Sequence, residues 1–254
     1  MKIPVSVAII TKNEEKNIRE ALESVKDFEE IVIVDSFSND KTVEICRKYT
    51  DKIFQIEWKG FSWQKQFAID KTTLSWVLVL DADERVTEEL KKEILERIKD
   101  KDTVGYFISR KNFFLGKWIK HSGWWPDYTL RLFRKDKGKM EERQVHEKIV
   151  VEGKTDYLKE PLIHYTYQSI EDVIEKMQNY SRLSAMEIIK KNPSKYKILI
   201  KMTVAPIFTF FKMFVLRFGF LDGLRGFLLA IFYSFYSFLK YAKAWEKYGN
   251  RKTV

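Results

Sequence analysis

The chain has 254 residues, 45% hydrophobic and 15% aromatic, enough for one large core or for one domain with an appendage. Its one cysteine, Cys46, excludes an internal disulfide framework and fits a reducing compartment. The net charge of +10 is uneven, because residues 168–254 carry 15 Lys+Arg against 6 Asp+Glu while residues 1–167 are nearly neutral. The opening run "MKIPVSVAII" lacks a small-residue cleavage site, so we expect a first strand rather than a secretion signal.

Short β-rich runs alternate with amphipathic segments over the first 114 residues. We expect strands at 5–10, 30–35, 51–58, 75–81 and 105–114, and helices at 13–27, 38–49, 61–72 and 87–100, the last capped by Thr87. This alternation predicts an α/β fold whose parallel sheet is covered by helices on both faces. Ligands of such sheets bind beyond the carboxyl ends of the strands. The polar residues that close or follow the strands should therefore meet at one rim.

The pattern is less regular after residue 114. A Gly-Trp-Trp-Pro turn precedes Asp127, and residues 143–153 are typical of a strand and turn. Residues 161–169 predict a short strand that leads into a helix from about 170 to 191. Trp124 and Trp125 can each stack on a sugar face or pack in the core, and we expect one of each.

Three acids within four positions end the apolar run of "WVLVLDADERV". Asp81 and Asp83 project to the same side at a strand end, where two carboxylates can hold Mg²⁺ or Mn²⁺ together with water and phosphate oxygens. The alternative is a solvated loop in which Glu84 pairs with Arg85 at the surface. The position directly after a buried strand favours the metal site.

Polar residues at the ends of the first two strands suit a nucleoside. Asp35 ends a buried strand, where its carboxylate can accept from a uracil imide or a ribose hydroxyl, or can serve as a turn acid. Thr11 and Asn13 follow the first strand and can do the same, or can cap the next helix.

The segments "VSVAIITKNEEKNI", "IVIVDSFSNDKTVEI" and "WVLVLDADERV", in this order, resemble the family 2 glycosyltransferases. A narrower resemblance, to the bacterial enzymes that add glucose to inner-core heptose of lipopolysaccharide, is carried by "GFSWQKQFAI", "GWWPDYTLRLFRKD", "VHEKI", "LIHYTY" and "GFLDGLRGF". The resemblance implies a GT-A fold, a Rossmann-like mixed sheet with helices on both faces, over residues 1–167. It also implies a UDP-sugar donor, UDP-glucose above others, and Mg²⁺ or Mn²⁺ as cofactor.

The resemblance further implies roles for single residues on the donor side. Thr11, Asn13 and Asp35 match nucleoside-binding segments, and Lys65 matches a basic or polar position near the diphosphate. Many relatives have an Arg-Asn pair where this chain has Gln64-Lys65-Gln66. Asp81 matches the acid near the ribose or metal, and Asp83 matches the principal metal ligand.

Inverting transfer needs a base, because the acceptor hydroxyl loses a proton as it attacks the anomeric carbon. Asp127 is the first choice, because Arg131 follows it by four positions and this acid-then-arginine order resembles the family. Glu147 is the second choice. His146 can ligate the metal, contact the diphosphate, act as a base or be structural. His164 is expected to be structural.

Residues 168–254 are predicted to form a helical, basic and aromatic region. Its longest uncharged run, 226–239, has 14 residues, fewer than the roughly 20 that span a bilayer. Cations interrupt the aromatic and aliphatic residues, which is typical of helices that lie in the membrane interface. We therefore expect a peripheral, monotopic protein at the cytoplasmic face of the inner membrane, with a lipid-linked saccharide as acceptor. The alternative is a helical hairpin packed on the catalytic domain or on a partner chain.

Other functions are less consistent with the sequence. A nucleotidyltransferase should have a Gly-rich phosphate loop after the first strand, and "TKNEE" is not one. A non-catalytic module that binds nucleic acid or membrane would rely on the basic charge, which lies here among Phe and Leu and so favours a bilayer over nucleic acid. A transferase that uses another nucleotide sugar, with a polyprenyl-phosphate or other glycolipid acceptor, is also consistent with the sequence.

Overall fold

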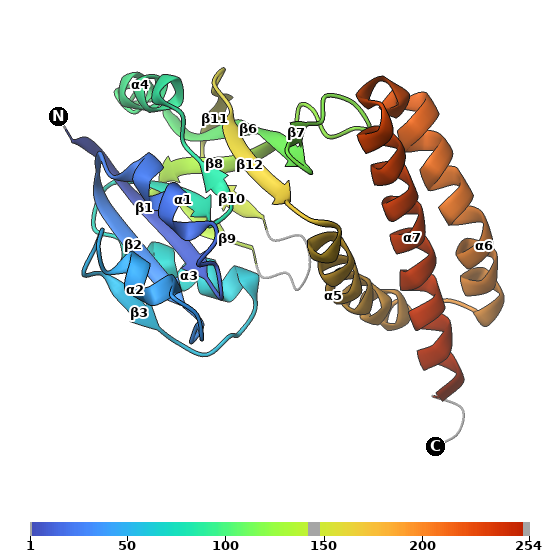
Figure 1. Cartoon of the computed structure of the whole chain (residues 1–254). Coiled ribbons are helices and arrows are strands. Elements are labelled where there is room, and N and C mark those ends of the chain that lie inside the picture. The colour runs from blue at the N-terminus through green and yellow to red at the C-terminus, as the bar shows by residue number, and fades with distance from the viewer. Residues whose placement is uncertain (1, 142–147, 251–254) are drawn as a thin grey trace. The chain divides into compact units, whose positions relative to one another are not determined.

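The computed structural model describes residues 2–141 and 148–250, which form two compact units (Figure 1). The sheet unit comprises Met1–Lys111 and Asp127–Tyr165, and the helical unit comprises Asn112–Pro126 and Thr166–Val254. Two strands, β6 (Thr103–Phe114) and β12 (Leu162–Tyr167), begin in the sheet unit and end in the helical unit. Residues 112–126 thus group with the C-terminal helices, although they precede Asp127 in the chain.

A mixed sheet forms the first unit, with strands in the order β3-β2-β1-β4-β8-β6-β12-β5. Four of them are parallel neighbours: β1 (Ile3–Thr11), β2 (Phe28–Asp35), β3 (Ile53–Gln55) and β4 (Trp76–Asp81). The strand β8 (Tyr128–Arg134) runs antiparallel to both β4 and β6, so the expectation of an all-parallel sheet is wrong, and the mixed sheet implied by the resemblance is confirmed. Residue patterns report burial on both faces but not strand direction, which the connections decide.

Shorter strands complete the sheets. They are β5 (Glu84–Arg85), β7 (Lys117–Trp118), β9 (Gly138–Met140), β10 (Ile149–Val151) and β11 (Lys154–Tyr157). Residues 143–153 were expected to hold a strand and turn, and β10 is the part of that segment that the structure describes; residues 142–147 lie outside the described residues.

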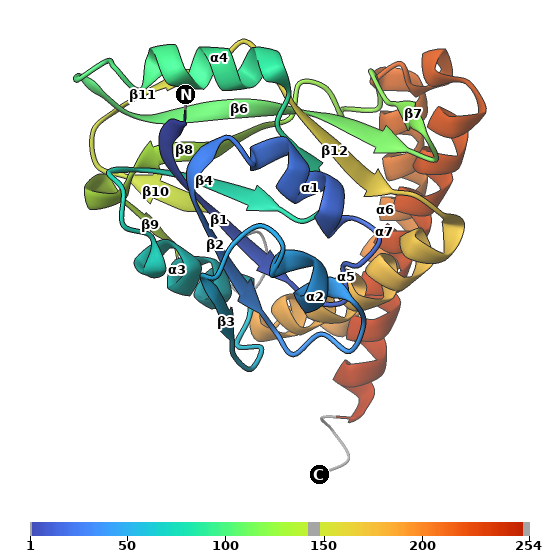
Figure 2. The ribbon, with the colours of Figure 1, turned by 60° about the vertical axis from the view of Figure 1, so that its left-hand side comes forward.

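Helices cover both faces of the sheet, as predicted. One face is covered by α1 (Ile18–Val25), α2 (Thr42–Cys46) and α4 (Glu88–Arg97), and the first two lie in front of the sheet in Figure 2. The other face is covered by α3 (Phe61–Lys71) together with β9 and β10. The predicted cap is confirmed, because Thr87 Oγ1 accepts from the Leu90 amide at 3.2 Å.

The first two helices are shorter than predicted. Asn13 has a left-handed φ of 55°, and its amide donates to Ser38 Oγ at 2.8 Å. Its side-chain oxygen accepts from the Asn39 amide at 2.8 Å. These long-range hydrogen bonds replace helical ones, so α1 begins only at Ile18.

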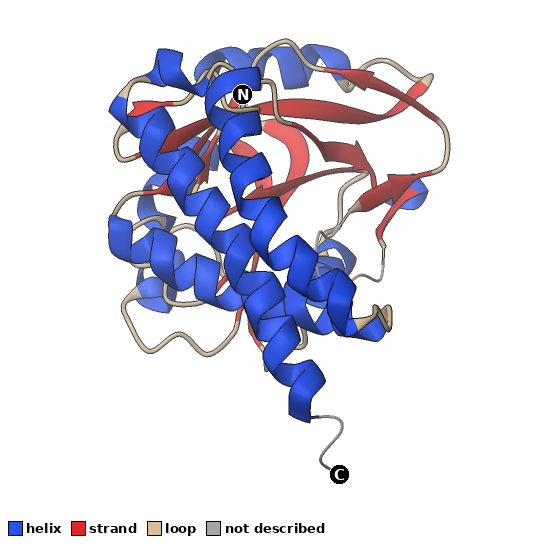
Figure 3. Ribbon diagram, turned by 90° about the vertical axis from the view of Figure 1, so that its right-hand side faces the viewer, coloured by secondary structure: helices blue, strands red, loops and turns tan. Residues whose placement is uncertain are grey.

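The helical unit is built from α5 (Ile170–Lys190), α6 (Lys195–Phe211) and α7 (Leu224–Asn250), seen side by side in Figure 3. Ser169 and Asp172 form a capping box at the start of α5, which explains why the helix predicted from about residue 170 begins there. A π-helical turn, η2 (Lys212–Leu216), and a 3₁₀ turn, η3 (Gly219–Asp222), join α6 to α7.

The buried carboxylate of Glu30, on β2, joins neighbouring segments of the sheet unit through hydrogen bonds. Glu30 accepts hydrogen bonds from Ser6, Lys52 and the backbone and side chain of Thr73. Burial alone raises the pKa of the Glu30 carboxyl, but these hydrogen bonds outweigh it and lower that pKa to about 2. A depressed carboxyl pKa stabilises the fold above the unfolded value near 4.5, and this contribution is lost as the pH falls toward 2.

We expect Glu30→Gln to lower the free energy of unfolding at pH 7 by about 1–3 kcal/mol, because charge-assisted hydrogen bonds to a buried carboxylate are lost. The difference from the wild type should shrink between pH 4.5 and pH 2, where the native carboxylate itself becomes protonated. Urea unfolding at a series of pH values measures both. Glu29→Gln, at the exposed neighbouring position, is the control, and an equal loss at all pH values would contradict the assignment.

Candidate active site

The carboxyl ends of the central strands lie level with one another. Thr11 pairs in register with Asp35, and Ile10 pairs in register with Asp81. The predicted rim therefore exists, and it brings residues from β1, β2 and β4 to one edge of the sheet unit.

Two cations from distant parts of the chain bind the Asp81 carboxylate. Lys65, on the buried side of α3, places its Nζ 2.8 Å from one oxygen, and Arg131, on β8, places Nη2 2.5 Å from the other. Burial raises the pKa of Asp81, but the charges of Arg131 and Lys65 dominate and hold it well below the usual range. Asp81 is thus an ionised carboxylate that remains partly open to solvent.

Glu84 is fully buried, which excludes the solvated-loop alternative for this segment. Its carboxylate accepts from Arg131 Nη2 at 2.6 Å and from the Asp81 amide at 3.0 Å. Arg85 does not pair with it through its side chain; the Arg85 guanidinium donates to backbone carbonyls and pairs with Glu20. Arg131 therefore neutralises both Asp81 and Glu84. Because Arg131 lies far from these acids in the chain, the sequence does not indicate the pairing.

The predicted base lies on the same network. Arg110, on β6, donates to Asp127 Oδ2 from Nε at 3.0 Å and from Nη2 at 2.6 Å. The Arg110 amide also donates to the Asp127 carbonyl at 3.0 Å, and Arg110 Nη1 lies 3.5 Å from Glu84 Oε1. Arg110 fixes the orientation of the Asp127 carboxylate, and no sequence pattern that we used indicates this role.

Asp83 has a histidine beside it. The Asp83 carboxylate lies 3.5 Å from His164 Nε2, and the Asp83 carbonyl accepts from the Tyr165 amide at 2.9 Å. The strand β12 thus places the imidazole of His164 at the acidic motif, whereas the sequence favoured a structural role. His164 is the third residue of β12, and the only sequence signal for this segment is that "LIHYTY" belongs to the family resemblance.

Asp35 is fully buried and organises the ends of β1 and β2. Its carboxylate accepts from Thr11 Oγ1 at 2.9 Å, from Ser38 and from Gln55 Nε2 at 3.2 Å. The α3 helix is tied to the same region, because Gln64 Nε2 donates to Ser36 Oγ at 2.6 Å. The ends of β1, β2 and β3 are therefore joined by side-chain hydrogen bonds in addition to strand pairing.

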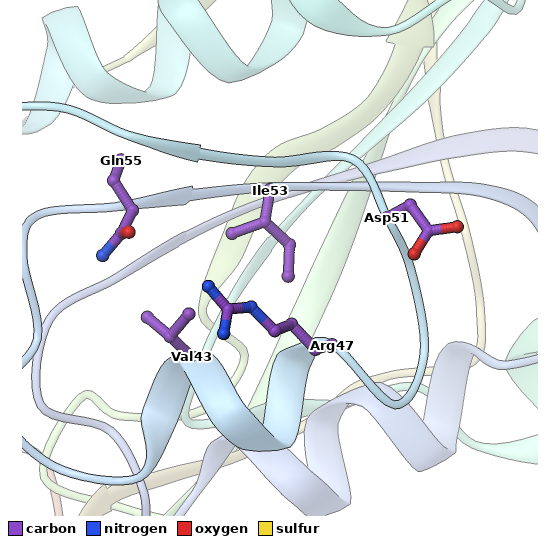
Figure 4. A pocket seen from close by; sticks show the side chains of 5 residues that line it. All are labelled: Val43, Arg47, Asp51, Ile53 and Gln55. Carbon is purple, nitrogen blue, oxygen red and sulfur yellow. The ribbon is translucent and has the colours of Figure 1, made fainter.

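A pocket of about 330 Å³ opens beside Gln55, whose amide contacts Asp35 (Figure 4). Its lining comes from α2 and from β3 with the segment before it: Val43, Arg47, Asp51, Ile53 and Gln55. Two aliphatic side chains, one arginine, one aspartate and one amide make a mixed lining that suits a planar group with hydrogen-bonding atoms.

The sheet unit thus gathers Thr11, Asn13, Asp35, Lys65, Asp81, Asp83 and Asp127, seven of the nine residues predicted for the site. The other two, His146 and Glu147, lie outside the described residues.

Two side chains here have donor atoms that could bind a divalent cation. Among the described residues no three His, Cys, Asp or Glu side chains lie together as a ready-made metal site. Asp83 and His164 nevertheless offer a carboxylate and an imidazole side by side, a pair that Mn²⁺ accepts and that leaves further positions for phosphate oxygens and water. Asp81, by contrast, is engaged by two cations of the protein.

Comparison with known proteins supports the resemblance seen in the sequence. The family model "Glycosyl transferase family 2" matches residues 6–155. The chain is 32% identical over 258 residues to the lipopolysaccharide core biosynthesis glycosyltransferase LpsC of Rhizobium meliloti (strain 1021), with 98% of this chain and 94% of the relative covered. An uncharacterized glycosyltransferase of Rickettsia bellii (strain RML369-C) is 32% identical over 257 residues and covers 95% of this chain.

A solved structure shares the fold. The S. aureus TarS structure of residues 1–349 in complex with UDP-GlcNAc matches with a TM-score of 0.50 at 18% identity, covering 98% of this chain and 92% of that one. The family match spans most of the sheet unit, and the similarity to LpsC extends over nearly the whole chain. The chain is therefore a glycosyltransferase and belongs to glycosyltransferase family 2.

Proposed function

We propose that this glycosyltransferase moves a hexose, glucose from UDP-glucose, with inversion onto a membrane-linked glycan such as inner-core heptose of lipopolysaccharide. The observation that carries the proposal is the ionised carboxylate of Asp81, clamped between Lys65 and Arg131 at the strand ends beside Asp83. Its support from relatives is that LpsC is named for lipopolysaccharide core biosynthesis and that the TarS structure holds UDP-GlcNAc.

The nucleoside is proposed to bind at the ends of β1, β2 and β3. Asp35 holds Thr11, Ser38 and Gln55 in one hydrogen-bonded group, and the pocket beside Gln55 can take a planar base (Figure 4). Uracil offers an imide N–H and carbonyls to such groups. Asn13, which follows β1, is linked to the same group by its hydrogen bonds with Ser38 and Asn39.

The diphosphate is proposed to bind where Lys65, Arg131 and Asp83 meet the strand end. Lys65 and Arg131 are buried and permanently directed at this rim, so they stabilise negative charge without reorganising. Asp83 and His164 would hold Mg²⁺ or Mn²⁺, which, when bound, withdraws electrons from a leaving diphosphate. His146, which lies outside the described residues, is proposed as a further ligand.

Asp127 is proposed to accept the proton of the acceptor hydroxyl, with Glu147 as the alternative. Arg110 holds the Asp127 carboxylate in one orientation through two hydrogen bonds to Oδ2, which supports a fixed position for a proton acceptor. A single in-line displacement then inverts the sugar and needs no covalent enzyme intermediate.

The helical unit is proposed to contact the membrane. Large apolar side chains at helical spacing are exposed along α6 and into η2: Ile200, Val204, Ile207, Phe208, Phe211 and Val215. A second exposed stripe follows α7: Leu224, Phe227, Ile231, Phe235, Phe238 and Trp245. The segment Lys195–Leu216 has 22 residues and contains an 18-residue stretch with a mean hydropathy of 1.8, so by length and composition it could cross a bilayer, which we had not expected of this segment. The flanking lysines favour an interfacial position against anionic lipid.

We expect UDP to stabilise the wild type by about 2.7 kcal/mol at 100 times its Kd, which is a shift of several degrees, and expect Mn²⁺ to add to it. Asp83→Asn should keep the shift with UDP alone and lose the increment from Mn²⁺, because the carboxylate is the cation's ligand. Thermal unfolding with and without each ligand measures this. The exposed Asp102→Asn is the control. A full Mn²⁺ increment in the Asp83 variant would exclude the role.

Asp127→Asn should reduce sugar transfer by about 10²–10⁴-fold and leave the UDP-induced shift unchanged, because a proton acceptor is lost while the donor site is intact. Radiolabelled transfer to lipopolysaccharide truncated at its inner-core heptose measures the rate. Asp136→Asn is a matched control, since Asp136 pairs with Arg134 at the surface. If Glu147→Gln loses transfer and Asp127→Asn does not, the base is Glu147.

Replacing Ile207, Phe208 and Phe211 together by Ser should release the protein from anionic vesicles while changing the melting temperature little, because these side chains are exposed. Vesicle sedimentation measures binding, and a carbonate wash separates a peripheral from a spanning helix. The control replaces Ile174 and Met186, exposed on α5, by Ser. Unchanged sedimentation of the α6 variant would argue against the membrane face.

A further inference from the structure

The elbow, residues 212–225, joins α6 to α7 through η2 and η3 and includes the first two residues of α7. The motif "GFLDGLRGF" (219–227) lies in the second half of the elbow and extends into α7. Its glycines permit backbone contact. A Cβ on Gly219 would lie 2.5 Å from Ser122 Oγ and 2.6 Å from the Met213 carbonyl oxygen, and a Cβ on Gly226 would lie 1.9 Å from the Gly219 carbonyl oxygen. The motif is therefore built to bring the elbow against residues near Ser122.

Asp222 holds that contact within the helical unit. Its buried carboxylate accepts from the Lys120 amide at 3.2 Å and from the His121 amide at 2.9 Å, and lies 3.2 Å from His121 Nδ1. The Ser122 amide donates to the Arg217 carbonyl at 2.8 Å. A buried carboxylate that binds two backbone amides across about a hundred residues of chain fixes the conformation of the loop that carries them.

The loop held in this way, residues 117–125, presents aromatic side chains, and we call it the tryptophan loop. Trp124 is buried in the helical unit's core against Phe114, Tyr167 and Tyr233. Trp118 and Trp125 are partly exposed and meet edge to face, with ring centroids 5.3 Å apart. Lys120 places its Nζ 4.8 Å from the centroid of the Trp118 ring.

We propose that the tryptophan loop is the binding platform for the acceptor saccharide and that Asp222 is the positioning residue that sets it; this rests on the proposed function. The partly exposed rings of Trp118 and Trp125 would contact sugar rings, and Lys120 would meet a phosphate or carboxylate on the glycan. Pro126 then connects the loop directly to Asp127, the proposed base.

The elbow also carries an exposed apolar surface that would contact the membrane. Its outer side exposes large apolar groups: Val215, Leu216, Phe218, Phe220, Leu221 and Leu224. Such a tip suits the lipid surface that anchors a lipid-linked acceptor. The elbow would thus contact the membrane with its apolar side chains and, through Asp222, set the conformation of the tryptophan loop that precedes Asp127.

The platform is tested with Trp118→Ala and Trp125→Ala in the full chain, assayed on heptose-terminated lipopolysaccharide in vesicles. Each should raise KM for the acceptor about tenfold or more, and leave the UDP-induced thermal shift and acceptor-independent hydrolysis of UDP-glucose within about twofold of wild type. Trp63→Ala is the matched control, because Trp63 also stacks on an aromatic ring beneath a lysine. Wild-type KM in both loop variants overturns the platform.

Asp222→Asn and Asp222→Ala test the positioning role. Both should speed hydrogen exchange at the Lys120 and His121 amides and raise KM for the acceptor, the alanine variant more, because asparagine retains one acceptor oxygen. Asp172→Asn, which loses a helix cap in the same unit, should lower the melting temperature without raising that KM. Unchanged exchange and KM in the Asp222 variants overturns the inference. A wild-type chain that binds no UDP overturns the proposed function instead.

Discussion

The balance of charge at the end of β4 is the constraint on which the site depends. Asp81, Asp83 and Glu84 lie within four positions, and Glu84 is fully buried. Carboxylates so close repel one another, and a buried charge that loses its partner costs about 3–5 kcal/mol. Arg131, on β8, and Lys65, on α3, supply the positive charges that pair with these acids. The pairing therefore requires β8 and α3 to pack beside the end of β4.

This balance also makes the rim suitable for chemistry. Arg131 and Lys65 are held by protein carboxylates before any ligand arrives, so their orientation is fixed in advance. Arg110 extends the same network from Glu84 to Asp127. The proposed diphosphate site would thus contain cations whose desolvation is already compensated, and Asp83 and His164 are the proposed metal ligands.

The helical unit obeys a different constraint. Its inner surfaces pack aromatic residues around Trp124 and Met213, whereas α6 and α7 leave long apolar stripes exposed. A globular unit in water rarely leaves such stripes uncovered, so a lipid surface is the partner that its composition suits. Within this unit Asp222 also binds the loop that precedes Asp127, so the helical unit fixes the conformation of that loop.

Much of the fold and part of the site follow from sequence. The strands that become β1, β2 and β4 are apolar runs closed by polar residues, so the rim and its residues Thr11, Asp35 and Asp81 are predictable. Thr87 and the capping residues of α5 are local signals, and they place helix starts correctly. The family resemblance, carried by ordered motifs, extends the prediction to Asp83 and Asp127.

What sequence alone determined is therefore local: which residues are apolar, which acids close strands, and which helices begin at caps. Only the tertiary structure decided that β8 runs antiparallel and that His164 lies beside Asp83. It also decided that Arg131, and not Arg85, forms the ion pairs with Asp81 and Glu84. It also decided that Asp222 holds a loop about a hundred residues away. The reason is that charge pairing and burial depend on distances in space, and residues far apart along the chain carry no local pattern that reports those distances.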